Sequence, residues 1–108
     1  LDSDGALADA ELNLDTARLL EQAGPWGQGF AAPLFENEFD IVEARAVGQQ
    51  QDHARYRLRS GSFSGAAIHF HAPAVVPAGR VRCLYRLNVN RWNGTESADL
   101  LIELIEPL

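Results

Sequence analysis

Arginine is the residue type in this sequence whose number and spacing most clearly indicate chemistry. All nine basic residues are Arg, and none is Lys. A guanidinium presents five donors in a rigid fork, which suits contacts with phosphate groups and stacking on planar rings. Arg55, Arg57 and Arg59 stand at alternate positions, so on a β-strand they would line one face at intervals of roughly 7 Å. This stripe predicts a surface for an anionic ligand.

A second stripe, formed by Arg80, Arg82 and Arg86, has two interpretations. It either faces an anion or pairs with carboxylates on a neighbouring strand. The acidic residues placed to make such pairs are Glu36, Glu38 and Asp40. Near the first stripe the sequence offers only Asp52. Because like charges without partners repel, an anionic partner is the favoured interpretation there.

Aromatic residues in two expected loops add to this surface. Trp92 lies in a loop that the dipeptide Asn93-Gly94 marks as a hairpin turn. Trp26 and Phe30 lie in a connector rich in Gly and Pro. Proteins that bind single-stranded nucleic acid use such rings as platforms for bases. The ordinary alternative, in which the rings cover one end of the fold, stays open.

The three histidines raise the question of a metal site, because zinc takes imidazole ligands. His69 and His71 are expected on the outer face of one strand, and His53 on its neighbour. No carboxylate or thiolate joins them at a spacing typical of a metal site, so we predict no metal ligands. We also predict no catalytic residues, since the serines over residues 60–64 lack the setting of a nucleophile elbow.

One helix and five strands would position these residues. Asn13 is predicted as the N-cap of a helix that Gly24-Pro25 ends. From Phe35 onward apolar residues recur with a period of two, which indicates strands. The strands are predicted at residues 35–47, 53–60, 63–71, 80–90 and 97–105.

The alternation within each strand predicts which side chains face the core. In the first strand the apolar parity shifts from Ile41 to Val42, Ala44 and Ala46, which predicts a β-bulge. The other residues expected to face inward are Phe39, Ala54, Tyr56, Leu58, Ile68, Phe70, Val81, Cys83, Tyr85, Leu87, Val89, Leu100, Ile102 and Leu104.

Five short strands within 108 residues predict a mainly β fold, a five-stranded OB-type barrel preceded by one N-terminal α-helix. Residues 1–24 are expected to form an acidic leading segment and the helix, and residues 25–108 the OB-fold domain. The first eleven residues are interpreted as a frayed, linker-like start. In such barrels the ligand lies on the second and third strands, between the loops after strands one and four.

The net charge of −6 alone argues against a nucleic-acid partner, but its distribution does not. Residues 1–44 carry ten acidic residues and one Arg, residues 45–95 carry eight Arg and one Asp, and residues 96–108 carry four acidic residues. Positive charge is thus concentrated on the strands expected to bind a ligand. The single Cys83 and the lack of a long apolar run predict a cytoplasmic protein without a membrane partner.

The sequence also resembles a known family. Gly24-Pro25-Trp26-Gly27-Gln28-Gly29-Phe30, followed by Pro33-Leu34-Phe35-Glu36, is similar to the start of the C-terminal OB domain of bacterial RecJ, the single-strand-specific 5′-to-3′ DNA exonuclease. The similarity continues through Ala67-Ile68-His69-Phe70 and residues 85–94, and covers residues 12–108. Extra residues at Gln49-Gln50-Gln51 depart from the family pattern.

This resemblance implies the OB domain of a nuclease, a hydrolase of DNA repair and recombination. Its catalytic core, which uses manganese or magnesium, would lie before the OB domain and outside this chain. No cofactor and no catalytic residue are therefore expected in the chain itself. The domain would hold single-stranded DNA and direct its 5′ end toward the core.

The resemblance also implies roles for particular residues. Arg55, Arg57 and Arg86 would contact phosphates, and Trp92 would stack on a base. The full set expected to bind DNA is His53, Arg55, Arg57, Arg86, Asn90, Arg91 and Trp92. Base identity would not be read, because contacts with phosphates and ring faces carry no sequence information.

An alternative function is a protein-interaction module that docks the nuclease core or the bacterial single-strand-binding protein. Both proteins are partners that the resemblance implies beside DNA. The apolar residues expected to be exposed for such contacts are Trp26, Leu84, Leu101 and Ile105.

Overall fold

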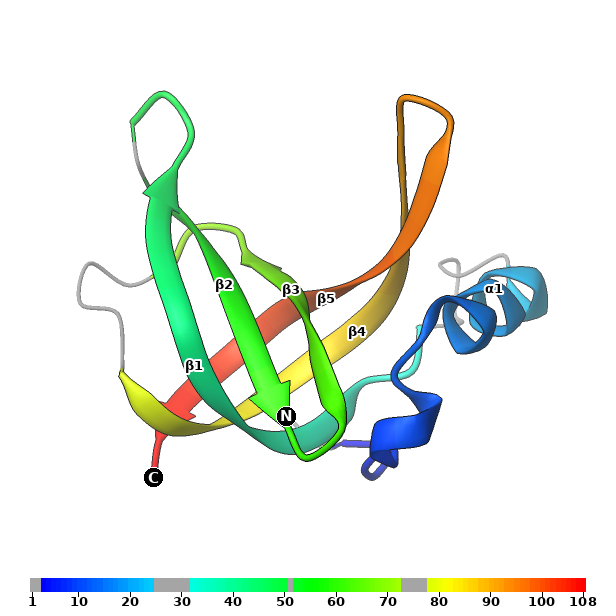
Figure 1. The fold of residues 1–108 in the computed structure, drawn as a ribbon, viewed down its shortest axis with the longest axis horizontal. Helices are drawn as coiled ribbons and strands as arrows, with labels where there is room; N and C mark the ends of the chain where they lie inside the picture. Colours follow the sequence, from blue (N-terminus) through cyan, green and yellow to red (C-terminus); the bar gives the residue numbers. More distant parts are fainter. Residues whose placement is uncertain (1–2, 25–31, 51, 73–77) are drawn as a thin grey trace.

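A computed structural model describes residues 3–24, 32–50, 52–72 and 78–108. In chain order its elements are a short 3-10 helix (Asp9–Glu11), α1 (Leu14–Ala23), β1 (Phe35–Val47), β2 (His53–Ser60), β3 (Phe63–His69), β4 (Gly79–Trp92) and β5 (Thr95–Pro107) (Figure 1). The prediction of a mainly β fold with one preceding helix is confirmed. Trp26, Phe30 and Gln51 lie outside the described residues.

The five strands close into a barrel in the order β1-β2-β3-β5-β4, as in OB folds. Neighbouring strands are antiparallel except for β3 and β5, which run parallel through the pairs Ala67–Leu100 and Ile68–Leu101. Helix α1 packs against β4 and β5 (Figure 1). Its N-cap is Asn13, whose side chain accepts a hydrogen bond from the Thr16 N–H at 2.9 Å, as predicted.

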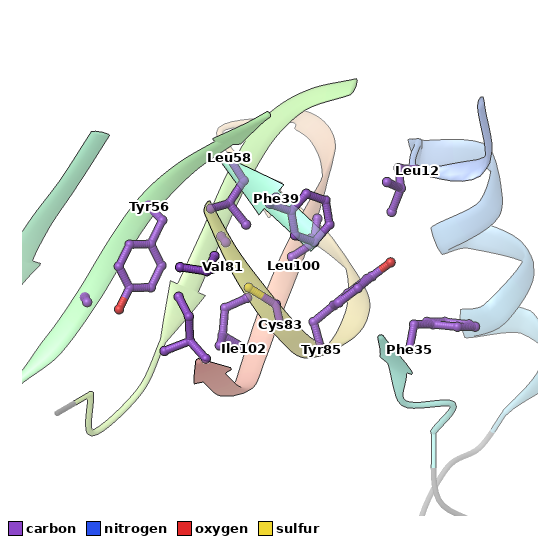
Figure 2. Close-up of a cluster of buried hydrophobic side chains, with 13 residues drawn as sticks. Leu12, Phe35, Phe39, Tyr56, Leu58, Val81, Cys83, Tyr85, Leu100 and Ile102 are labelled. Atoms are coloured by element: carbon purple, nitrogen blue, oxygen red, sulfur yellow. The ribbon is translucent and has the colours of Figure 1, made fainter. Parts of the chain in front are cut away.

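The core fills the interior of the barrel with side chains from every strand (Figure 2). The Phe39 ring contacts the rings of Tyr85 and Phe63, with centroids 5.7 Å and 5.8 Å apart. The Tyr85 hydroxyl donates to Asn37 Oδ1 at 2.6 Å, so its one polar atom is satisfied. Cys83 is buried among these residues, and burial raises the pKa of its thiol to about 12.

The leading segment is bound to the barrel, so the prediction of a frayed start is wrong. The Asp4 N–H donates to the Leu34 carbonyl at 2.6 Å, and the Asp4 carboxylate accepts from the Leu34 N–H at 2.8 Å. The Asn37 side chain likewise bonds both backbone groups of Leu7. Leu12 is buried in the core. These contacts hold the segment before α1 against the start of β1.

Two bulges change the side-chain alternation. The one in β1 falls between Ile41 and Glu43, as predicted. A second separates the pair Leu84–Leu104 from the pair Tyr85–Ile102, and it places the extra residue in β5. Beyond it the parity reverses. Leu104 therefore points outward, and Ile105 is buried, against the prediction for both.

The inward and outward faces of β3 are the reverse of the prediction. His69 and Ala67 are buried, whereas Ile68 is partly exposed and Phe70 is exposed. The pairing with β2 explains this, because His69 lies opposite Ala54 and Ala67 opposite Tyr56. Directly paired residues share a face, and both β2 partners face the core.

The expectations about burial are also wrong for four further residues. Val42, Ala44 and Ala46 are exposed, although Ala44 and Ala46 lie opposite the buried Tyr56 and Ala54 of β2. Leu84, expected at the surface, is buried next to the bulge in β5. No helix among the described residues is long and apolar enough to span a membrane.

Candidate nucleic-acid interface

The arginines divide into two groups according to their ion pairs. Those paired with carboxylates are Arg18, Arg80, Arg82, Arg86 and Arg91, on α1 and β4. Arg82 shows the pattern, with Nη2 2.7 Å from Glu106 Oε2 and Nη1 3.4 Å from Glu36 Oε2. Arg80 Nη1 lies 3.3 Å from Asp40 Oδ2. The pairing interpretation is therefore correct for the stripe on β4.

The other four arginines lie on β1 and β2. Among the described residues, none of them has a carboxylate oxygen within 4.0 Å. We call Arg45, Arg55, Arg57 and Arg59 the basic face. Arg45 lies directly opposite Arg55, and like charges in such a pair are destabilising. An anion bound between them would remove this repulsion.

The basic face contains a shallow depression of about 210 Å³. It is lined by Glu43, Arg45, Arg55, Tyr56, Arg57 and Ala66. Three arginines thus line one hollow, and among the described residues Glu43, opposite Arg57, is the only acidic residue lining it. The hollow is shallow and open, which suits an extended polyanion better than a small enclosed ligand.

The outer face of β3 continues this surface and is apolar. Ile68 lies opposite Arg55, and Ala66 opposite Arg57. Just past the end of β3, Phe70 is 56% exposed and its ring contacts His53 edge-on, with centroids 5.3 Å apart. The sequence interpretation missed Phe70 and Arg45. Because Ala67 and His69 pair with the buried Tyr56 and Ala54, the alternation along β3 places Phe70 on the outer face. This cross-strand pairing was the signal that could have found it.

His53 lies beside Asp52 and His71, and their ligand-type atoms are within 4.8 Å of one another. However, His53 Nδ1 accepts a hydrogen bond from the His71 N–H at 3.0 Å. A neutral imidazole in that state carries its proton on Nε2, which faces Asp52 Oδ1 at 3.4 Å. Nε2 therefore has no lone pair for a metal. Since Mg²⁺ and Mn²⁺ also prefer oxygen ligands, these residues do not fit the ions expected for a catalytic core.

The β4–β5 hairpin carries three of the predicted residues. Trp92 is 73% exposed at its tip. Arg91 is held by both oxygens of Glu21 on α1, at 2.5 and 2.8 Å, and by Glu96 at 2.9 Å. The hydrogen bonds from Arg91 lower the pKa of Glu21. Arg91 must leave these carboxylates before it can contact a phosphate.

Asp99 connects the hairpin with the basic face. Asn90 Nδ2 donates to Asp99 Oδ2 at 3.0 Å. Burial raises the pKa of Asp99, while the charge of Arg55 and the hydrogen bond from Asn90 act in the opposite direction. Asn90 on β4 and Arg55 on β2 therefore approach the same carboxylate from two sides of β5.

Arg86 lies apart from the basic face, on β4. It lines a groove of about 250 Å³ between α1 and the sheet, together with Ala17, Leu20 and Leu101. Its Nε is 3.7 Å from Glu103, and its Nη1 is buried without a hydrogen-bond partner in the described part of the chain. The structure thus brings His53, Arg55 and Arg57 together but places Arg86 beside the helix.

Two hairpins rise from the barrel on either side of β2 and β3 (Figure 1). One connects β1 to β2, and the other connects β4 to β5. The basic face and Phe70 lie on the strands between them. This is the surface on which OB folds bind oligonucleotides and oligosaccharides. The geometry therefore matches a nucleic-acid interface with cations on β1–β2 and apolar groups on β3.

Comparison with known proteins gives one family. Residues 3–104 match the family described as the RecJ OB domain. The chain is 37% identical over 112 residues to the single-stranded-DNA-specific exonuclease RecJ of Haemophilus influenzae, and 34% identical over 110 residues to that of Escherichia coli K12. Each match covers 98% of this chain but only 20% and 19% of the relative. The chain thus spans about a fifth of the length of these relatives.

Solved structures show the same fold. RecJ from Thermus thermophilus in complex with Mg²⁺ matches all of this chain with a TM-score of 0.78 at 21% identity. The same enzyme in complex with Mn²⁺ matches with a TM-score of 0.71 at 20% identity. This chain corresponds to 17% and 16% of those chains.

Proposed function

The chain belongs to the family of RecJ OB domains, and on that premise we propose that it binds single-stranded DNA for a single-strand-specific exonuclease. The relatives that are 37% and 34% identical to this chain are named single-stranded-DNA-specific exonucleases. The catalytic core and its metal ions would belong to the remaining four fifths of such an enzyme. The role in DNA repair and recombination, and a place in the cytoplasm, belong to the same proposal.

The observation that carries the proposal is the separation of paired from unpaired arginines. The arginines of β4 and α1 are neutralised by carboxylates within the fold. Those of the basic face have no carboxylate oxygen within 4.0 Å among the described residues, and Arg45 lies directly opposite Arg55. A phosphate backbone supplies the missing negative charge without requiring a defined base sequence.

In the proposed complex the strand crosses β2 between the two hairpins. Arg55 and Arg57 contact phosphates, and Arg45 adds a third charge to the same hollow. Trp92 stacks on a base at the tip of the β4–β5 hairpin. The proposed contacts on the hairpin are Asn90 and Arg91. The resemblance also implies His53 and Arg86, which lie beside Phe70 and beside α1. Binding in this way holds the strand and leaves its 5′ end to the nuclease core.

Fluorescence anisotropy with a labelled single-stranded oligonucleotide tests the proposal. For three neutralised phosphates, log Kobs should fall against log salt with a slope near −2, because each phosphate contributes about −0.7 on single strands. Arg55→Ala and Arg57→Ala should each weaken binding and reduce the magnitude of the slope by about 0.7.

Arg80→Ala and Arg82→Ala are the matched controls, because they remove arginines that the fold already pairs. They should leave affinity and slope unchanged. Binding that is absent, or that responds equally to all four substitutions, would contradict the proposal.

The alternative of a protein-interaction module makes the opposite prediction. Arg55→Glu and Arg57→Glu would then leave DNA affinity unchanged and alter binding of the catalytic domains or of the single-strand-binding protein. Two of the apolar contacts expected for such a module, Leu84 and Ile105, are buried. The described surface therefore favours the DNA-binding function.

A further inference from the structure

Phe70 is an aromatic residue that the fold leaves at the surface. The rings of Phe35, Phe39, Tyr56 and Tyr85 are buried in the barrel, whereas Phe70 is 56% exposed. Isolated exposed apolar residues are common and need no explanation by themselves. What distinguishes Phe70 is its position beside the basic face and the way a neighbouring side chain holds it.

The neighbour that holds Phe70 is His53. The two rings meet at 79° with centroids 5.3 Å apart, an edge-to-face contact. A Phe side chain restrained in this way loses little further freedom when a ligand stacks on it.

His53 is itself fixed from several directions. Its Nδ1 accepts from the His71 N–H at 3.0 Å, and its Nε2 faces Asp52 at 3.4 Å. A Cβ on Gly48 would come within 3.0 Å of the His53 ring, so glycine lets the chain approach closely here. His53 Nδ1 is thus bonded within the protein, and Nε2 lies beside a carboxylate. These contacts orient the imidazole ring against Phe70.

We propose that Phe70 is a stacking platform for an unpaired nucleobase and that His53 is its positioning residue. This inference rests on the proposed function. It adds a binding residue that the sequence did not indicate and gives His53 a different role from a direct DNA contact.

The platform fixes which side of the strand faces which element. The outer face of β3 carries Ala66, Ile68 and then Phe70, while the outer face of β2 carries Arg55 and Arg57. Bases therefore lie toward β3 and phosphates toward β1–β2. Because every base has a ring face, the platform accepts any sequence.

The test compares Phe70→Ala with the wild-type chain by anisotropy, on an ordinary oligonucleotide and on one of equal length with abasic sites. Phe70→Ala should weaken binding to the ordinary strand about 5- to 150-fold, the range that follows from base–aromatic stacking. The salt slope should stay unchanged, since no phosphate contact is lost. Phe70→Tyr should retain the affinity, and the abasic strand should bind the wild type and Phe70→Ala alike.

Leu19→Ala is the matched control, because Leu19 is an exposed apolar residue on α1. It should leave the affinity unchanged. His53→Asn keeps an acceptor for the His71 N–H but removes the ring. It should weaken binding in the wild type and have no further effect in the Phe70→Ala background, as expected for a coupled pair.

The outcomes separate this inference from the proposed function. If Arg55→Ala and Arg57→Ala weaken binding while Phe70→Ala does not, the platform is wrong and the DNA-binding function stands. If Phe70→Ala lowers the salt slope together with the affinity, the residue acts on the phosphate contacts and stacking is again wrong. If the wild-type chain does not bind single-stranded DNA, both proposals fail.

Discussion

At the scale of a single residue, His69 is a histidine that the fold buries. The side chain is only 7% exposed, and its Nδ1 has no hydrogen-bond partner among the described residues. Burial lowers the pKa of His69, and the charge of Glu103 only partly opposes this. The folded protein therefore keeps His69 neutral at a pH where the unfolded chain would protonate it.

This difference predicts a pH dependence of stability. In the unfolded chain the imidazole titrates near its ordinary pKa of 6.5. Its contribution to stability is therefore complete above pH 6.5 and decreases as the pH falls toward the lowered pKa of the folded state. The slope reaches at most about 1.4 kcal/mol per pH unit for one proton. Urea unfolding from pH 7.5 to pH 5 measures it.

The variant His69→Leu should flatten this profile, because it removes the buried titrating group. His71→Asn is the control, since Asn tolerates the positive φ of 53° at that position and the site is exposed. An equally steep profile in His69→Leu would show that another group is responsible.

The candidate site was predictable from the sequence only in part. The stripe on β2 was found because alternate Arg residues share a face on any strand. The stripe on β4 has the same spacing, and only the pairing of β4 with β1 and β5 shows that carboxylates neutralise it. Phe70 was assigned to the core because hydrophobicity alone favours burial, and its true face depends on cross-strand pairing.

At the scale of elements, a network of ion pairs fastens α1 to the β4–β5 hairpin. Arg91 bonds Glu21 and Glu96, and Arg18 reaches Glu96 at 2.6 Å. Asp15 on α1 also pairs with Arg18, at 3.7 Å. Because these side chains are exposed, salt screens their attraction. The network of ion pairs fixes Arg91 on the side of the hairpin that faces α1.

This network makes a prediction for DNA binding. Glu21→Gln releases Arg91 from its strongest partner, so the affinity for single-stranded DNA should rise and the salt slope should steepen by up to about 0.7. Glu38→Gln removes a carboxylate beside Arg80 and controls for the general loss of negative charge. If both variants behave alike in the anisotropy assay, Arg91 is not a phosphate contact.

The elements themselves were largely predictable. The N-cap at Asn13 and the limits of β1 and β2 follow from local residue patterns. The bulge in β5 does not, because it is a property of the pairing with β4 and leaves the local sequence without a signal. It moved Leu104 and Ile105 to opposite faces from those predicted.

At the scale of the whole molecule, paired and unpaired arginines occupy different parts of the barrel. Helix α1 and its carboxylates lie beside β4 and β5, while the basic face lies on the β1–β2 ribbon, at the opposite side of the barrel (Figure 1). The net charge of −6 is therefore a poor guide to the charge at the basic face. A ligand there responds to the local arrangement of Arg45, Arg55 and Arg57 around the hollow.

The parallel contact between β3 and β5 has a consequence for local opening. Among the described residues it consists of the pairs Ala67–Leu100 and Ile68–Leu101, whereas β4 and β5 pair over nearly their whole length. Short pairing between strands distant in sequence should open at a lower free energy than global unfolding. Those amides of residues 67–68 and 100–101 that bond across the contact between β3 and β5 should therefore exchange faster than amides that bond between β4 and β5.

A strand of DNA lying across β2 and β3 would oppose that opening, because it binds only the closed surface. Bound DNA should therefore slow amide exchange at the contact between β3 and β5, here called the seam, more than exchange between β4 and β5. Uniform slowing throughout the barrel, or exchange at the seam only by global unfolding, would contradict the prediction. If exchange slows most at the contact between β3 and β5, that contact is the part of the fold whose motion a bound strand suppresses.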